Sequence, residues 1–218
     1  MTPQMGLFFG AIAFLATHFL MSHPLRAPLI RLLGWKGFQV AYSLVAIILF
    51  GLMIWFYDGI GRERTAWQPT DWAWNVGAVL LWLGAILFVG SFVGNPALPG
   101  APGPRGGPKG VFAITRHPMM WGFSLWAISH IIVIATPKAV MFYGAILLLA
   151  LVGSALQDRK KAGLMGETWH EWTTQTAFIP FGRGLAHPGW FAFIGGTILY
   201  LAATWLHPIP VGVWRWLG

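Results

Sequence analysis

Six long stretches of apolar residues divide this sequence, and they constrain its fold more than any other feature. The stretches cover residues 3–22, 37–57, 72–93, 118–135, 138–156 and 190–206. A helix needs roughly 20 apolar residues to cross a hydrocarbon core of about 30 Å. We therefore predict an all-α polytopic membrane protein, a bundle of about six transmembrane helices that forms a single domain over residues 1–218.

The composition favours lipid over water or nucleic acid as the surroundings of the chain. Hydrophobic residues make up 56% and charged residues 9%, whereas soluble domains average about 45–50% and about 25%. The 14 Lys and Arg residues give a net charge of +8, but they are scattered singly between apolar stretches. A nucleic-acid surface would gather them on one face. The lipid bilayer is the expected partner, with no nucleic acid.

Loop charges predict an orientation, because Lys and Arg are retained on the cytoplasmic side of a membrane. With six spans, the first, third and fifth loops share one face and carry ten of these residues: Arg26, Arg31, Lys36, Arg105, Lys109, Arg116, Arg159, Lys160, Lys161 and Arg183. The opposite face carries four: Arg62, Arg64, Lys138 and Arg215. We expect the basic loops inside and both termini outside.

Two histidines fall inside the predicted spans, His18 in the first and His130 in the fourth. Ionisable residues within the hydrocarbon are costly, so each is a candidate functional residue. A haem iron can be held between two imidazoles, whereas a lone membrane histidine also serves in an interhelical hydrogen bond. The residues alone leave both interpretations open. Cysteine is absent from the sequence, so a thiolate ligand is excluded in either case.

A polar group precedes the fourth span, where Thr115, Arg116 and His117 lead into Pro118. Free backbone amides at a helix start favour an anion, which Arg116 and His117 would reinforce. A haem propionate, a phosphate or a carboxylate would fit. The alternative is that these residues only anchor the helix at the membrane interface.

Two segments outside the spans carry further predictions. The loop over residues 94–117 is rich in Pro and Gly and is either a flexible connector or an ordered lid. Residues 157–189 are predicted to form a cytoplasmic amphipathic segment, with Trp169 and Trp172 turned towards lipid. Glu167 and His170 have the spacing of half a di-iron site, but the second half is missing from the sequence.

These motifs resemble the NnrU family of bacterial membrane proteins, which is related to the zeta-carotene isomerases of plants and cyanobacteria. The matching stretches are His18 with His23-Pro24-Leu25-Arg26, the block ITRHPMMWGFSLWAISH that ends at His130, Asp158-Arg159, Gly166, and Phe178-Ile179-Pro180-Phe181. The resemblance covers nearly the whole chain. Its RHP block, with a histidine thirteen residues later, is the most specific part.

The resemblance implies a haem b protein of the bacterial inner membrane. It makes His18 and His130 the expected iron ligands, and Arg116, His117, Trp126, Asp158 and Arg159 the expected cofactor-binding residues. If the protein is an enzyme, a haem-dependent isomerase or an oxidoreductase linked to nitrogen-oxide metabolism is implied, with an apolar or small-molecule ligand. In the isomerases a cysteine can replace one iron ligand, and here that position is Ala127.

Two alternative functions stay open. Residues 110–181 also resemble the S-adenosylmethionine-dependent membrane methyltransferases that act on phospholipid head groups and isoprenylcysteine, which share the RHP motif. Those enzymes place paired glutamates where this chain has Asp158-Arg159-Lys160, which argues against their chemistry. The other alternative is a non-enzymatic assembly partner of a membrane respiratory complex.

Overall fold

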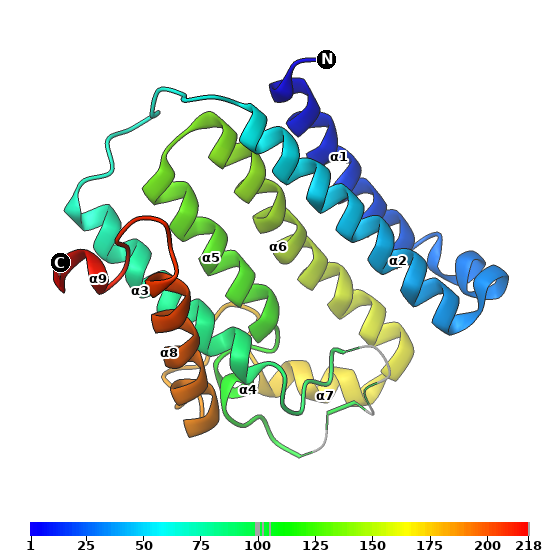
Figure 1. Cartoon of the computed structure of the whole chain (residues 1–218). Helices are drawn as coiled ribbons and strands as arrows, with labels where there is room; N and C mark the ends of the chain where they lie inside the picture. Colours follow the sequence, from blue (N-terminus) through cyan, green and yellow to red (C-terminus); the bar gives the residue numbers. More distant parts are fainter. Residues whose placement is uncertain (99–100, 102, 105, 218) are drawn as a thin grey trace. The chain divides into compact units, whose positions relative to one another are not determined.

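The computed structural model describes residues 1–98, 101, 103–104 and 106–217. Within them the chain forms nine helices and no strand (Figure 1). The helices are α1 (Pro3–Ser22), α2 (Arg26–Gly59), α3 (Asp71–Gly90), α4 (Val111–Ile114), α5 (Pro118–Ile134), α6 (Pro137–Met165), α7 (Glu167–Gln175), α8 (Trp190–Trp205) and α9 (Trp214–Leu217). The predicted all-α class is confirmed.

Each of the six predicted spans corresponds to a helix. Four of these helices, α1, α2, α3 and α6, are long and apolar enough to cross a membrane. Helices α5 and α8 are also apolar but have 17 and 16 residues. At 1.5 Å per residue they are about 25 Å long, slightly shorter than a hydrocarbon core of about 30 Å. The chain is therefore a polytopic helical membrane protein.

The chain divides into two compact units. The first unit contains residues Met1–Gln68 and Ile134–Leu149, and the second contains Pro69–Val133 together with the chain from Ala150 onwards. Helix α6 contributes its first part to the first unit and its second part to the second unit.

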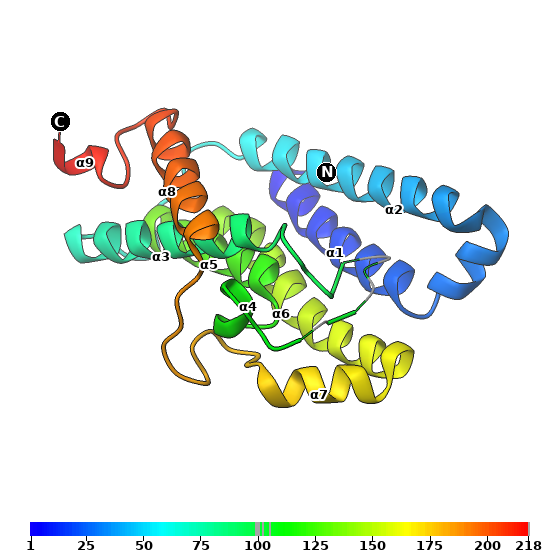
Figure 2. The same cartoon turned by 90° about the horizontal axis from the view of Figure 1, so that it is seen from below.

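In the first unit, helices α1 and α2 lie side by side and antiparallel (Figures 1 and 2). Gly6 of α1 lies so close to the ring of Phe56 that a Cβ atom there would clash with it. Leu7 of α1 and Met53 of α2 are fully buried. Small residues such as Gly6 let membrane helices approach closely, since packing rather than the hydrophobic effect drives the association of these helices.

Helix α2 begins well before its predicted span, and a kink separates the two parts. Gly34 has φ 69° and ψ 170°, which interrupts the helical backbone. Glycine adopts this left-handed φ without the steric penalty of a Cβ atom. The apolar pattern locates the part after Gly34, whereas the more polar part before it was not predicted to be helical.

Lys138 links the end of α2 to the start of α6 in the first unit. Its Nζ atom donates hydrogen bonds to the carbonyls of Ile60 (2.7 Å) and Gly61 (3.3 Å), and its backbone N–H donates to Glu63 Oε2 (2.9 Å). A cation near the carboxyl end of a helix satisfies carbonyls that lack a helical partner. Lys138 therefore has a structural role, in addition to being one of the basic loop residues from which the orientation was predicted.

In the second unit, α3 packs against both α8 and α5 through glycines. A Cβ atom on Gly196 of α8 would clash with the backbone of Ile86 on α3. A Cβ atom on Gly84 of α3 would lie 3.1 Å from the carbonyl oxygen of Gly122 on α5. These backbones touch because no side chain separates them, which is how small residues act between membrane helices.

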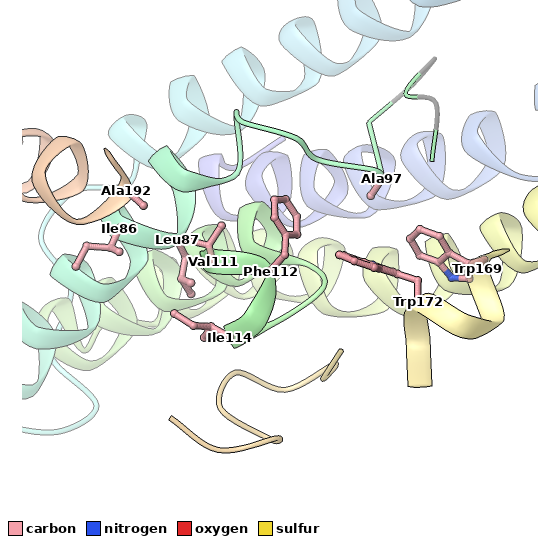
Figure 3. Close-up of a cluster of buried hydrophobic side chains, with 9 residues drawn as sticks. All are labelled: Ile86, Leu87, Ala97, Val111, Phe112, Ile114, Trp169, Trp172 and Ala192. Atoms are coloured by element: carbon pink, nitrogen blue, oxygen red, sulfur yellow. The ribbon is translucent and has the colours of Figure 1, made fainter. Parts of the chain in front are cut away.

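The two tryptophans of α7 are buried in protein, so the prediction that they face lipid is wrong. Trp169 is 1% exposed and Trp172 6% exposed, and both belong to an apolar cluster with Ala97 and Phe112 (Figure 3). The ring centroids of Trp172 and Phe112 are 6.3 Å apart. The i, i+3 spacing does put both indoles on one face of α7, but α4 and the loop after α3 cover that face.

The loop after α3 is fixed to α6 at residues 96–98. Gln157 donates to the carbonyl of Ala97 (3.1 Å), and Lys161 Nζ donates to the carbonyls of Pro96 (3.0 Å) and Leu98 (3.5 Å). These hydrogen bonds attach this part of the 94–117 loop to α6. Pro99, Gly100, Pro102 and Arg105, which belong to the same loop, lie outside the described residues.

Candidate functional site

His18 lies on α1 in the first unit, among aromatic rings. Its Nδ1 atom is 2.7 Å from the carbonyl oxygen of Phe14, one helical turn earlier. Its ring centroid lies 4.3 Å from that of Phe14 and 5.4 Å from that of Tyr42. A carbonyl oxygen only accepts hydrogen bonds, so Nδ1 carries the proton and Nε2 carries the lone pair.

His130 lies on α5 in the second unit and has the same local arrangement. Its Nδ1 atom is 2.8 Å from the carbonyl oxygen of Trp126, again one turn earlier. The rings of His130 and Trp126 lie 4.7 Å apart, which places the predicted cofactor residue Trp126 directly against the imidazole. The same reasoning assigns the proton to Nδ1 and the lone pair to Nε2.

The shared arrangement is the one that suits a metal-binding histidine. Such histidines almost always donate the other ring N–H to a carboxylate, a carbonyl or water, which fixes the tautomer and the ring orientation. Each helix supplies that acceptor from its own backbone, because residues i and i−4 lie on one face. Within the described part of the chain, no group of three or more His, Asp or Glu side chains gathers as a metal-binding cluster.

The polar constellation before α5 forms a compact cluster in the second unit, which we call the Asp158 cluster: Arg116, His117 and Asp158. Asp158 Oδ2 accepts from Arg116 Nε (2.8 Å) and lies 2.7 Å from Arg116 Nη2. Asp158 Oδ1 accepts from His117 Nε2 (2.9 Å). The side chains are 14%, 0% and 18% exposed for Arg116, His117 and Asp158. Three residues of the predicted cofactor set are therefore brought together.

The carboxylate of Asp158 is the anion that Arg116 and His117 contact in this structure. Asp158 satisfies one guanidinium edge and the Nε2–H of His117 at the same time. Hydrogen bonds to an ionised acceptor such as this carboxylate are about twice as strong as neutral ones. The predicted binding of a propionate, phosphate or other carboxylate by these residues stays a prediction, and such an anion would compete with Asp158.

A short segment after α7 completes the surroundings of the cluster, and the sequence did not predict its role. The backbone N–H of Arg116 donates to the carbonyl of Ala177 (2.9 Å). The carbonyl of Phe178 accepts from both Thr115 Oγ1 (2.7 Å) and Trp121 Nε1 (2.8 Å). These three hydrogen bonds attach the segment to the start of α5. The matching residues Phe178 to Phe181 were the only sequence signal for it.

The remaining predicted residues do not join the cluster. Arg159 follows Asp158 on α6 but is exposed. Glu167 and His170 on α7 are also exposed. Successive helical residues differ by about 100° in direction, so Asp158 faces the cluster and Arg159 does not.

Comparison with known proteins identifies a family. A family model described as NnrU protein matches residues 6–215, from the first turns of α1 into α9. The match includes both His18 and His130 and the whole Asp158 cluster. No curated protein and no solved structure matches the chain.

Proposed function

Since this chain belongs to the NnrU family of membrane proteins, we propose that it binds haem b and that His18 and His130 are its iron ligands. The observation that carries the proposal is the shared arrangement of the two histidines. Each donates from Nδ1 to the carbonyl one turn earlier, which assigns the lone pair of the neutral ring to Nε2. Both residues have the donor chemistry that haem iron requires.

A bound haem would supply one-electron chemistry, and two imidazole ligands favour electron transfer or redox sensing over direct substrate binding at the iron. The protein's contribution is to orient the imidazoles through the carbonyls of Phe14 and Trp126. The rings of Phe14 and Tyr42 lie against the imidazole of His18, and the ring of Trp126 lies against that of His130. A redox protein of nitrogen-oxide metabolism is the corresponding function, whereas a haem-dependent isomerase would require one of the two histidines to leave the iron.

We assign the Asp158 cluster a positioning role for the helix that carries His130. Arg116 and His117 immediately precede α5, and Asp158 holds both. The first turn of α5 is thereby fixed to α6 and to the segment after α7. Since His130 is on the same rigid helix, its depth and direction depend on where α5 begins.

We further propose that the protein lies in the bacterial inner membrane with both termini on the periplasmic side. The support is the distribution of Lys and Arg, ten against four in favour of one face. Positive residues near span ends set orientation in this way.

The visible absorption spectrum of the protein purified from haem-replete cells tests the function. We expect a Soret band that shifts or weakens in both His18→Ala and His130→Ala, and that is unchanged in His170→Ala, an exposed histidine. A colourless wild-type preparation would overturn the haem proposal. A Soret band that is untouched by the first two substitutions would overturn the ligand assignment. Binding of S-adenosylmethionine to haem-free protein would favour the methyltransferase alternative instead.

A further inference from the structure

The second unit contains an apolar pocket of about 390 Å³ between α3, α5, α8 and the segment after α7. Its walls include Trp82 and Ile86 of α3, Trp121 and Leu125 of α5, Phe193 of α8, and Phe181. All of its lining residues are apolar. The volume lies within the range of about 300–1,000 Å³ that is usual for ligand pockets.

No side chain in the lining offers a free polar group to a ligand, although two of the lining residues are tryptophans. The indole N–H of Trp82 donates to Thr197 Oγ1 (2.9 Å), and that of Trp121 donates to the carbonyl of Phe178 (2.8 Å). Both rings therefore present only their carbon surfaces to the pocket. A polar ligand would lose its hydrogen bonds to water without replacement, so the pocket selects hydrocarbon.

Phe181 is held at the edge of this pocket in an unusual backbone conformation. Its φ is +62°, which is rare for an aromatic residue. Its N–H donates to the carbonyl of Ile114 (3.0 Å), and its own carbonyl accepts from Gly184 (2.9 Å). Two hydrogen bonds thus fix a strained residue whose ring lines the pocket, and strain of this kind is typical of ligand-contacting positions.

The edge of the pocket is exposed, near the ends of α3, α5 and α8 that we place on the cytoplasmic side of the bilayer. Ile179 is 63% exposed and Phe181 is 39% exposed, and both line the pocket. Apolar side chains that are exposed at the depth of the hydrocarbon contact acyl chains, which are as apolar as leucine. The bilayer therefore supplies a hydrocarbon chain at high concentration next to an opening that excludes polar ligands.

We propose that this pocket binds one acyl chain of a membrane phospholipid. The proposal goes beyond haem binding and does not depend on it, because every residue that carries it lies in the second unit and none is a proposed iron ligand or part of the Asp158 cluster. The rings of Trp82, Trp121 and Phe181 contact the chain, and the head group stays outside among the exposed residues of the 179–188 segment.

Photo-crosslinking tests the occupant. The full-length protein is reconstituted with a phosphatidylglycerol that carries a diazirine near the end of one acyl chain, and the labelled peptides are identified by mass spectrometry. We expect labels on α3 and α5 peptides that contain Ile86 and Leu125. Labels confined to exposed residues such as Ile198, which is 61% exposed, would mean ordinary surface lipid and would overturn the proposal.

Two adjacent substitutions provide a matched comparison. Ala186→Trp adds an indole at a residue that lines the pocket, whereas Leu185→Trp places one at a side chain that is 94% exposed. Displacing as few as two methylene groups lowers affinity about tenfold. Labelling of the pocket peptides should therefore fall about tenfold in Ala186→Trp only. Equal labelling in both variants would contradict the assignment.

A third variant tests the pocket independently, in case Ala186→Trp does not fold. Phe181→Gly removes the ring and relieves the positive φ, since glycine adopts that conformation freely. We expect it to melt at the same temperature as the wild type or higher, and to lose label from the pocket peptides. A lower melting temperature with full labelling would mean that Phe181 only supports the fold.

Discussion

His117 and Asp158 stand 41 residues apart in the sequence, yet His117 Nε2 lies 2.9 Å from Asp158 Oδ1. The imidazole is fully buried, and its Nδ1 atom has no hydrogen-bond partner among the described residues. The bond to Asp158 is therefore the main polar anchor of a residue that directly precedes α5. This contact fixes the entry of that helix to the far end of α6.

Replacing Asp158 with asparagine should destabilise the second unit. The neutral amide cannot balance the guanidinium of Arg116, and a hydrogen bond to a charged group contributes about 1.5–3 kcal/mol. We expect the free energy of unfolding to fall by about that amount, measured in detergent micelles. Glu171→Gln, at an exposed residue of α7, is the control, and equal stability of the two variants would rule out this role for Asp158.

The pairing of Arg116 with Asp158 should appear as a coupling energy. In a double-mutant cycle with Arg116→Gln and Asp158→Asn, we expect the two losses of stability to be non-additive by about 0.5–3 kcal/mol, as is usual for residues in direct contact. Additive losses would mean that each residue acts through other neighbours. If the cluster positions α5, both single variants should also perturb the haem spectrum in the same direction as each other.

Substitution of Gly196 by alanine should disturb helix packing in the second unit, whereas the same substitution at Gly153 should not. Gly196→Ala forces a Cβ atom into the backbone of Ile86, whereas a Cβ atom on Gly153 meets nothing within 4 Å. Overpacking of this kind costs about 1–3 kcal/mol, so Gly196→Ala should lower the melting temperature while Gly153→Ala leaves it unchanged or raises it. Thermal melts followed by circular dichroism make the comparison.

The loop after α3 should loosen when its lysine tether is removed. Lys161→Met deletes the donor to the carbonyls of Pro96 and Leu98, so we expect faster hydrogen exchange in the peptide that contains these residues. Arg159→Met, at an exposed position on the same helix, serves as the control. Unchanged exchange in Lys161→Met would mean that Gln157 and packing suffice to hold the loop.

The absence of cysteine from the sequence makes the orientation directly testable. In Leu185→Cys the thiol should react with a membrane-impermeant maleimide only after the cells are permeabilised, because we place that loop inside. In Thr70→Cys the thiol, in the loop between α2 and α3, should react in intact cells. The reverse pattern would invert the topology.

Sequence reasoning located the helices well because lipid imposes a simple rule on them. The first predicted span, residues 3–22, coincides with α1 (Pro3–Ser22), and the last differs from α8 (Trp190–Trp205) by one residue. A chain in hydrocarbon must satisfy its backbone internally, so long apolar stretches become helices. The local sequence therefore carries most of the information about the spans.

The sequence was less informative where contacts are distant along the chain. Trp169 has the spacing of an interfacial anchor, but it is buried because α4 and the loop after α3 cover that face of α7. Similarly, Arg116 was expected to bind an external anion, and its partner Asp158 comes from a helix 42 residues later. Local patterns specify which face of a helix is apolar but not which segment will cover it.

Gln157, Asp158 and Lys161 lie within little more than one turn of α6, and together they hold the loop after α3 and the entry of α5. One inserted or deleted residue earlier in α6 would rotate this turn by about 100° and shift it by about 1.5 Å, which would break all three attachments at once. Helix α6 should therefore accept many apolar exchanges but no change in length between Ala150 and Gln157. The length of this part of α6 therefore determines whether the loop after α3 and the start of α5 can both be held in place.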